Sequence, residues 1–529
     1  MYVLAAAACI FYFITEAAVL SGDLGFPLDD SWIHLQFARN LATGQGLSYN
    51  PGEIVTGSTA PLWSALVSLV YLLPGNVFIW TQILGSALFL LSIDVTWRLG
   101  RALGLTDQAA SFATVLTLST SWLVWSALSG MEIPLFLCLS LWGILLHLRE
   151  RGRPDGLPLS LGVLALSCLA RPEGVLLLLL AVADRCLRWK EVETPDSTAE
   201  DGMLALGRPR LAPFAAGLVL ILSALIAPLL FYRLAGGSFL PTTFAAKAGP
   251  VRHALPSLPY LYNILSIFFR PQPFALLLLG AGVIQQIRRL GTVRDRGLLL
   301  SLWVIGLPLA YSMISHERTT LAGNFGRYYF PLFPVIILLA VLGIEPAARR
   351  LGSSITAGGH RVWLGAVLAV LILAPSVYNL IEGAGLYAVN VVNVQSSDVR
   401  TARWLAPRLN PAALIAVNDI GAFKYLLPNR VVDLAGIANP EILREVAAET
   451  QRGKPWGSAM LEAIASRRPD YIAIFPAWLP AVDKSPEFQR VYDLTIENNR
   501  TMGANELVVY RTPWTRFPLH EPGNIKPAE

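Results

Sequence analysis

The chain has 529 residues, of which 54% are hydrophobic and 15% are charged, and its mean hydropathy is +0.53. An ordinary soluble domain carries about 25% charged residues, so the composition excludes a purely soluble protein and predicts a polytopic membrane protein. The net charge of +5 does not indicate nucleic-acid binding, because the basic residues are scattered among short loops. The four cysteines lie in or beside apolar runs, which argues against disulfides and against a thiolate metal site.

Apolar runs long enough to cross a hydrocarbon core of about 30 Å recur up to residue 382. The first run contains Thr and Glu and lacks a basic leader, so we interpret it as a retained span. Residues 61–75 are apolar but short, and we interpret them as an interfacial or re-entrant helix. The eleven predicted spans are residues 3–20, 78–97, 109–127, 133–148, 157–169, 174–187, 212–232, 262–287, 297–314, 328–346 and 362–382.

The distribution of Lys and Arg among the loops supports this assignment. With residues 61–75 left out of the spans, one set of loops holds 17 Lys and Arg and the opposite, longer set holds 6. The positive-inside rule places the basic set in the cytoplasm. Eleven spans that start in the cytoplasm then put residues 21–77, the first outer loop, and the C-terminal part of the chain on the extracytoplasmic side.

The sequence divides into a predicted transmembrane domain, residues 1–382, and a mixed α/β domain, residues 383–529. In the second domain, short β-branched and aromatic segments predict strands, and amphipathic segments between them predict helices. The strands are expected at 412–419, 430–436, 470–475, 492–497 and 506–511, and the helices near 396–406, 441–449 and 457–466. The sequence contains no glycine-rich phosphate-binding loop of the common types.

Carboxylates gather in the loops of the predicted outer face. Asp29, Asp30 and Glu53 lie in the first outer loop, whereas Glu132 and Glu173 each lie in a later one. Ionisable groups at the edge of a membrane are costly, so they are functional candidates. A structural alternative stays open for Glu132 and Glu173, because each sits in a tight turn where a carboxylate can cap the next helix.

The segment DDSWIHLQFARN, residues 29–40, has an apolar pattern that predicts an interfacial helix beginning at the two aspartates. Adjacent helical positions point about 100° apart, so Asp29 and Asp30 cannot both cap the helix and both face one cavity. His34 lies one turn after Asp30. We expect it to be the helix-surface partner of Asp30, and we also count it among the candidate substrate-binding residues.

Cations on the predicted outer face are few, and a guanidinium or ammonium group at a membrane surface suits a phosphate headgroup. We expect Lys247 and Arg327 to contact such a phosphate. The alternatives are that these cations contact ordinary lipid phosphates and that Glu173 only pairs with Arg171. The candidate substrate-binding residues are Glu132, His34, Lys247, Arg327, Arg171 and Glu173.

The segment DDSWIHLQFARNLATGQGLSYNPGEIVTGSTAPLWSALVSL resembles the first outer loop of the GT-C superfamily of integral-membrane glycosyltransferases. The most similar branch is bacterial and includes the cell-wall arabinofuranosyltransferases. The resemblance implies a GT-C fold, a polyprenyl-phosphate sugar as donor, and transfer on the extracytoplasmic face by a carboxylate of the first outer loop. Further similar segments follow in order: SGMEIPLF (129–136), ARPEG (170–174), GGSFLPTTFAAK (236–247), GRYYFPLFP (326–334) and VNDIGAFKYLLPNRVVDLAGIANPEI (417–442).

These observations predict a hexosyl- or pentosyltransferase of the bacterial cytoplasmic membrane, in contact with membrane lipids. It is expected to transfer a sugar, with inversion, to a hydroxyl of a cell-envelope glycan or lipid. Asp29 is the predicted general base, because it lies closer to the Pro27 turn, and Asp30 is predicted to orient the helix or to assist acceptor binding. No cofactor and no metal ion are expected.

Two other classes of protein remain as alternatives. A transporter or flippase of lipid-linked sugars would also gather charges near the membrane, but it typically places polar sites near the bilayer midplane and shows internal repeats. The acids of this chain crowd one face, and the sequence shows no repeat. A scaffold with an outer binding domain would need far fewer than eleven spans.

Overall fold

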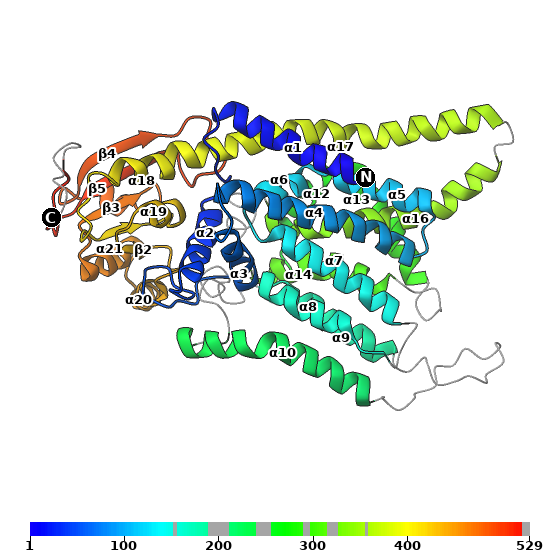
Figure 1. Ribbon diagram of the computed structural model, residues 1–529, viewed down its shortest axis with the longest axis horizontal. Coiled ribbons are helices and arrows are strands. Elements are labelled where there is room, and N and C mark those ends of the chain that lie inside the picture. Colours follow the sequence, from blue (N-terminus) through cyan, green and yellow to red (C-terminus); the bar gives the residue numbers. More distant parts are fainter. Residues whose placement is uncertain are drawn as a thin grey trace.

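The computed structural model consists of a helical bundle and, at one end of its long axis, a domain built on a five-stranded sheet (Figure 1). The long helix α17, Gly358–Val394, leads from the bundle toward the sheet domain. The predicted domain boundary after residue 382 therefore falls inside a continuous helix. The structure describes residues 1–151, 156–188, 211–237, 239, 255–288, 297–314, 326–354 and 358–520.

Apolar helices form the bundle. Within the described ranges, six helices are long and apolar enough to cross a membrane, or eight if each of two bent pairs counts as one span. Helices α8 and α14 are apolar but shorter, so the count of eleven spans stays a prediction. Besides α17 and the bent pairs, the helices are α1 (Tyr2–Val19), α4 (Val77–Ala102), α7 (Ile133–Glu150), α8 (Leu159–Ala170), α9 (Gly174–Arg188), α10 (Leu211–Gly236), α14 (Leu298–Ile314) and α16 (Phe333–Ser354).

Two of the predicted spans are bent. The chain bends by 59° between helices α5 (Asp107–Leu118) and α6 (Ser121–Leu128), and by 118° between α12 (Leu258–Phe269) and α13 (Pro273–Arg288). The predicted span over 262–287 is therefore a bent pair of helices, because prolines at 271 and 273 interrupt the helical hydrogen bonding. The side-chain amide of Gln272, between the two prolines, donates to the carbonyl oxygen of Leu116 (2.8 Å) and to Thr120 Oγ1 (2.9 Å). The break between α12 and α13 is therefore hydrogen-bonded to the break between α5 and α6.

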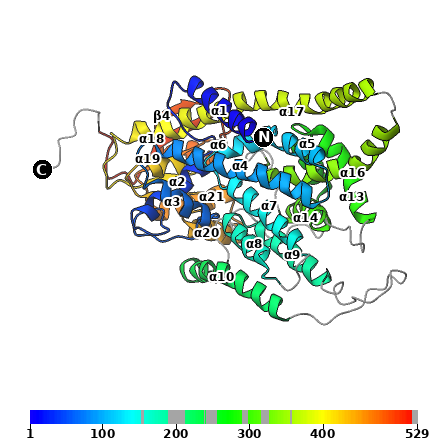
Figure 2. The ribbon, with the colours of Figure 1, turned by 45° about the vertical axis from the view of Figure 1, so that its right-hand side comes forward.

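The outer surface of the bundle is apolar. Helix α10 lies at the edge of the bundle in both views (Figures 1 and 2) and exposes Leu218, Val219, Leu222 and Ile226. Contiguous exposed apolar patches of this kind are rare on soluble monomers. This surface is suited to contact with lipid chains.

The first outer loop contributes two short helices, α2 (Asp29–Ala42) and α3 (Pro61–Val70), which lie between the bundle and the sheet domain (Figure 1). Nine of the 14 residues of α2 are buried. Ile33 and Phe37 pack in the core of the sheet domain, whereas Trp32 and Leu35 pack in the core of the bundle. The predicted helix is confirmed, but protein packs against it from two sides, which its apolar pattern did not reveal.

The strands of the C-terminal domain confirm the five predicted strands. The sheet has the order β2-β1-β3-β5-β4. Strand β1 pairs in parallel with β2 and β3, and β5 pairs antiparallel with β3 and β4. The strands are β1 (Ile415–Val417), β2 (Val431–Asp433), β3 (Tyr471–Ile474), β4 (Gln489–Thr495) and β5 (Glu506–Arg511).

Both faces of this sheet are covered. One face packs with Ile33 and Phe37 of α2 and with Ile420 and Phe423 at α19. The other face packs against α20 and α21, through residues such as Ile442 and Met460 on these helices. The segment after β1 therefore meets α2 at the carboxyl edge of the parallel strands. The helical segments are η3 (Gln395–Val399), α18 (Arg400–Leu405), α19 (Gly421–Leu426), α20 (Pro440–Gln451), α21 (Trp456–Arg467) and α22 (Pro480–Asp483), of which α19 and α22 were not predicted.

The topology can be tested with two exposed glutamines, Gln45 in the first outer loop and Gln108 at the start of α5. In a cysteine-free background, an impermeant maleimide added to intact cells should label Gln45→Cys and not Gln108→Cys, because the charge asymmetry places them on opposite sides. After cell lysis both variants should react. Equal labelling of both in intact cells would contradict the eleven-span topology.

Candidate active site at the bundle–sheet junction

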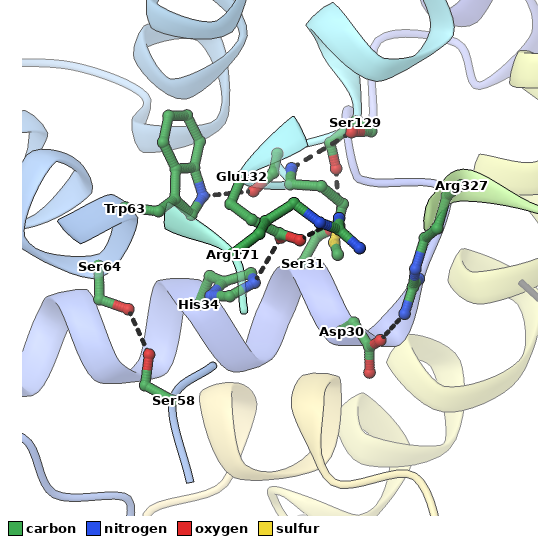
Figure 3. Close-up of polar contacts among 12 residues, drawn as sticks. Asp30, Ser31, His34, Ser58, Trp63, Ser64, Ser129, Glu132, Arg171 and Arg327 are labelled. Carbon is green, nitrogen blue, oxygen red and sulfur yellow. Dashed lines mark hydrogen bonds and ion pairs between the residues drawn. The ribbon is translucent and has the colours of Figure 1, made fainter. Parts of the chain in front are cut away.

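The candidate residues come from four separate segments that meet beside the sheet domain. Asp29 and Asp30 begin α2, Glu132 directly precedes α7, Arg171 directly follows α8, and Arg327 begins the 3-10 helix η2, Arg327–Leu332. Figure 3 shows His34, Glu132 and Arg171 on one side of α2 and the Asp30–Arg327 pair nearer its start.

The turn that carries Glu132 is fixed by α2 and α3. Ser31 Oγ donates to the carbonyl oxygen of Ser129 (2.6 Å), and the indole nitrogen of Trp63 donates to the carbonyl oxygen of Gly130 (2.9 Å; Figure 3). Gly130 has a φ of 72°, in the left-handed region that glycine adopts readily. These contacts hold the turn so that the side chain of Glu132 points toward α2.

A buried chain of charges runs through this turn. Arg171 bonds Glu132 Oε1 at 2.5 Å and Glu173 Oε1 at 2.9 Å, and His34 Nε2 lies 3.1 Å from Glu132 Oε2. The hydroxyl of Tyr311 donates to Glu173 (2.7 Å). Burial alone would raise the pKa of Glu132, but the nearby Arg171 and His34 lower it to about 2. Glu132 is therefore an ionised partner of Arg171 and does not have the character of a base at neutral pH.

Asp30 and Asp29 have different partners. Asp30 Oδ2 forms an ion pair with Arg327 Nη2 (Figure 3), and the side chain of Asp30 is 27% exposed whereas that of Arg327 is buried. Asp29 accepts two backbone hydrogen bonds from the C-terminal domain, from Gly421 N to Oδ2 and from Ala422 N to Oδ1, both at 2.7 Å. The two aspartates thus point to different neighbours, as the 100° step along a helix requires.

An aromatic ring joins the two arginines. The ring of Tyr328 lies 5.1 Å from the guanidinium carbon of Arg171 and 5.7 Å from that of Arg327. Arginines commonly stack on such rings. Both positive groups are therefore held near η2, on the bundle side of the two aspartates.

Several expectations need correction. His34 pairs with Glu132 and not with Asp30, because the His34 side of α2 packs against the turn before α7. Glu132 makes no side-chain cap at the start of α7. Glu53 pairs with Arg430 of the sheet domain (2.6 Å).

Other expectations have a different outcome. The expected alternative that Glu173 pairs with Arg171 is confirmed. Lys247 lies outside the described residues, so its expected phosphate contact stays a prediction. The assignment of Asp29 as the base and Asp30 as its assistant also stays a prediction.

Sequence reasoning missed three aspartates that lie near Asp29. Asp419 follows β1 and Asp433 ends β2, at the carboxyl edge of the parallel strands, where ligand sites of α/β sheets usually lie. Asp398 lies in η3, fully buried, with no hydrogen-bond partner for either oxygen among the described residues. The motif VNDIG around Asp419 was noticed only as part of a resemblance, since a single Asp after a strand carries little signal.

The carboxylates of this acidic cluster perturb one another. Burial raises the pKa of Asp29 to about 7, against the two backbone hydrogen bonds, which lower it. Burial and then the neighbouring Asp29 and Asp30 raise the pKa of Asp419 well above its usual value. Burial also raises the pKa of Asp433 to about 6. Within the described residues, no group of three or more His, Cys, Asp or Glu side chains is arranged to hold a metal ion.

Comparison with solved structures shows the fold. The ArnT protein of Cupriavidus metallidurans, bound to undecaprenyl phosphate, superposes with a TM-score of 0.57 and 14% identity, over 96% of this chain and 97% of that one. The oligosaccharyltransferase of Archaeoglobus fulgidus gives 0.56 and 13%, over 96% and 75% of the two chains. The arabinofuranosyltransferase AftD from Mycobacteria gives 0.52 and 16%, but this chain spans only 39% of its length. The GT-C fold that the resemblance implied is thus confirmed.

Comparison by sequence adds little. A family model described as a domain of unknown function (DUF8728) matches residues 388–515, which is the sheet domain together with the end of α17. No curated protein matches the chain by sequence.

The acidic cluster predicts a pH-dependent stability. A carboxyl group with a raised pKa stabilises the folded state fully below its unfolded pKa of about 4, and this contribution is lost as the pH rises through the folded pKa. The temperature at the midpoint of thermal unfolding should therefore decrease as the pH is raised from 4 to about 7. Asp419→Asn removes a carboxyl group whose ionised form is disfavoured by burial and by Asp29 and Asp30. It should raise the midpoint by roughly 2–4 °C at a pH where this carboxyl group is ionised, as expected for about 1 kcal/mol, and much less at pH 4.5.

The matched control is Asp493→Asn, which changes an exposed carboxylate of the same domain. It should leave the midpoint unchanged at both values of pH, because an exposed charge has no desolvation penalty to relieve. An equal change in Asp419→Asn and Asp493→Asn would show that no repulsion is stored in the cluster.

Proposed function

We propose that this chain is a membrane glycosyltransferase that moves a sugar from a polyprenyl-phosphate donor to a hydroxyl of an extracytoplasmic glycan or lipid. The observation that carries the proposal is the site at the start of α2. Here Asp30 pairs with the buried cation Arg327, and the adjacent Asp29 accepts hydrogen bonds from Gly421 and Ala422. The chain shares its fold over 96% of its length with a protein bound to undecaprenyl phosphate. A base beside a cation is the minimum that this reaction needs.

The proposed reaction is an inverting single displacement. The acceptor oxygen attacks the anomeric carbon, the bond from that carbon to the phosphate oxygen breaks, and polyprenyl phosphate leaves with the electron pair. The hydroxyl proton passes to a carboxylate as the attack proceeds. The leaving phosphate is already stable, so it needs positive charge nearby more than it needs an acid. A metal-free mechanism is part of the proposal.

Asp29 is the proposed base. A pKa of about 7 suits a general base near neutral pH. Its two hydrogen bonds from Gly421 and Ala422 leave further lone pairs on the carboxylate, since each carboxylate oxygen has about two acceptor positions. Asp30 is the proposed assistant, because it is tied to Arg327 and holds this cation beside the base.

Arg327 is the proposed phosphate ligand among the described cations. Arg171 is compensated by two carboxylates, Glu132 and Glu173, so it is better suited to keep the turn and Tyr328 in place. Among the residues that the structure describes, Arg327 is paired with the carboxylate of Asp30, and a guanidinium carries five N–H donors. Lys247 is retained as a second proposed phosphate ligand on the resemblance alone.

A place for the lipid chain is available in the bundle. A cavity of about 310 Å³ opens among α12, α13, α14 and α16, and its lining residues include Ile264, Phe268, Val304 and Ile336. The ring of Phe268 contacts Tyr329, two residues after Arg327. A largely apolar pocket beside the segment that carries the proposed phosphate ligand suits a polyprenyl chain. No observation favours a flippase.

The first test of this proposal removes the base. Asp29→Asn keeps the size of the side chain but cannot accept the proton, so turnover should fall by about 10²- to 10⁴-fold. Transfer is measured with purified protein, polyprenyl-phosphate-linked pentoses and hexoses labelled in the sugar, and envelope extract as acceptor. The wild-type rate should also decrease as the pH falls below about 7, because the carboxylate of Asp29 becomes protonated.

Asp23→Asn is the control, since Asp23 lies in the same loop and forms an exposed pair with Arg403. It should retain wild-type turnover. If Asp29→Asn is fully active and Asp30→Asn is inactive, the two roles are exchanged. If both are active, the carboxylate mechanism is excluded.

The second test concerns the phosphate. A charge-assisted contact contributes about 1.5–3 kcal/mol, so Arg327→Ala should weaken the binding of undecaprenyl phosphate by roughly 10- to 100-fold. Lys247→Ala should have a similar effect. The control is Arg403→Ala, which removes an exposed cation that pairs with Asp23. Unchanged affinity in both the Arg327 and Lys247 variants, measured by titration in nanodiscs, would assign these cations to ordinary lipid contacts.

A further inference from the structure

The contact between Asp29 and the C-terminal domain joins residues that are almost 400 positions apart. The backbone N–H groups of Gly421 and Ala422 each donate to a different oxygen of the Asp29 carboxylate at 2.7 Å. Both groups lie in the first turn of α19, where backbone N–H groups have no acceptor within the helix. The carboxylate thus supplies both missing acceptors, and the two amides fix the plane of the carboxylate.

Gly421 is the residue that allows this approach. A Cβ atom built on it would lie 2.1 Å from the backbone oxygen of Asp29 and 2.6 Å from its Oδ1. Real Cβ atoms do not approach other atoms so closely, so any side chain at 421 must push the start of α2 away. The fit is specific to a residue without a side chain.

The rest of the interface holds α2 and α19 in one position. The hydroxyl of Tyr49 donates to the carbonyl oxygen of Ile420 (2.5 Å), and Arg39 donates to the carbonyl oxygen of Tyr425 (2.9 Å). The amide side chain of Asn50 exchanges two hydrogen bonds with the backbone of Val431, at 3.0 and 3.1 Å. Polar contacts therefore anchor the loop after α2 to both β2 and α19.

We propose that the C-terminal domain is part of the active site, in which the backbone N–H groups of Gly421 and Ala422 are positioning groups that orient the carboxylate of Asp29 toward the acceptor hydroxyl. The inference rests on the proposed function. It assigns a role to the segment that matches the family of unknown function. The domain acts through Asp29 and is not required here to touch the sugar.

The contact itself is tested by hydrogen exchange of the intact protein in nanodiscs. In the wild type, the peptide that contains residues 420–424 should be protected, because its two leading amides are bonded to Asp29. Asp29→Ala should raise the exchange rate of these two amides by about tenfold or more, and Asp30→Ala should not. If Asp29→Ala is not monodisperse, Asp29→Asn serves instead, since its NH₂ group cannot accept from one of the two amides.

The positioning role is tested by a double-mutant cycle in the transfer assay. Gly421→Ala should lower kcat by roughly 10- to 100-fold while the affinity for undecaprenyl phosphate stays within twofold, because Arg327 belongs to η2 and not to the displaced start of α2. In the Asp29→Asn background, Gly421→Ala should cause no further loss, since it acts only through that carboxylate. The control is Gly457→Ala, whose added methyl group makes only ordinary contacts, 3.7 Å or more away.

The outcomes separate this inference from the proposed function. Asp29→Asn is expected to lose turnover. If Gly421→Ala then lowers the turnover of Asp29→Asn by the same factor as that of the wild type, Gly421 has a general structural role. In that case the inference is overturned and the proposed function is not. If residues 420–424 exchange equally in the wild type and Asp29→Ala, the contact is overturned. If Asp29→Asn keeps full turnover, the base assignment fails and the inference fails with it. The inference is supported if the double variant loses no more turnover than Asp29→Asn alone and if Asp29→Ala raises the hydrogen exchange of residues 420–424.

Discussion

The structure depends on one constraint, the burial of a polar helix between two apolar cores. Helix α2 carries Asp29, Asp30, His34 and Arg39, yet most of it is enclosed by the bundle on one side and the sheet domain on the other. Buried polar groups are costly unless they are paired. Each of these side chains has a specific partner on another segment, and these partners fix where the turn before α7, the start of η2 and the loop after β1 must lie.

This pairing separates two kinds of electrostatic environment along a short stretch of helix. On the bundle side, Arg171 and Arg327 accompany Glu132 and Asp30, and the pKa of Glu132 is low despite its burial. On the sheet side, Asp29 and Asp433 accept hydrogen bonds from backbone amides and Asp419 accepts one from the side chain of Asn418. The pKa values of these three carboxyl groups are raised mainly by burial. A carboxylate that can take up a proton thus lies one residue from one that is held by a cation. This difference between the two carboxylates suits the proposed reaction, in which a carboxylate takes up a proton and a phosphate leaves.

The sheet domain has a double role in this arrangement. Its hydrophobic face completes the burial of α2 through Ile33 and Phe37, and its first loop brings Gly421 against Asp29. Because the solved structures that share the fold are at most 16% identical over their matched regions, they establish the architecture and leave the chemistry to the residues of this chain. Those residues place the proposed base at the junction of the two domains.

The sequence alone determined the features that depend on local pattern. Apolar runs predicted the helices, short β-branched and aromatic segments predicted the five strands, and the two aspartates at the start of an apolar helical pattern predicted α2. The Glu173–Arg171 pair was also foreseen, because the residues are neighbours in one short turn.

Tertiary structure decided every contact made across the chain. His34 met Glu132, 98 residues away, and Asp29 met Gly421, since periodicity shows which face of a helix is polar but not what packs against it. The sharp bend at Pro271 and Pro273 and the acidic cluster around Asp419 were missed for the same reason. Prolines permit a break but do not set its angle, and a single carboxylate after a strand gains its meaning only from the charges that the fold places beside it.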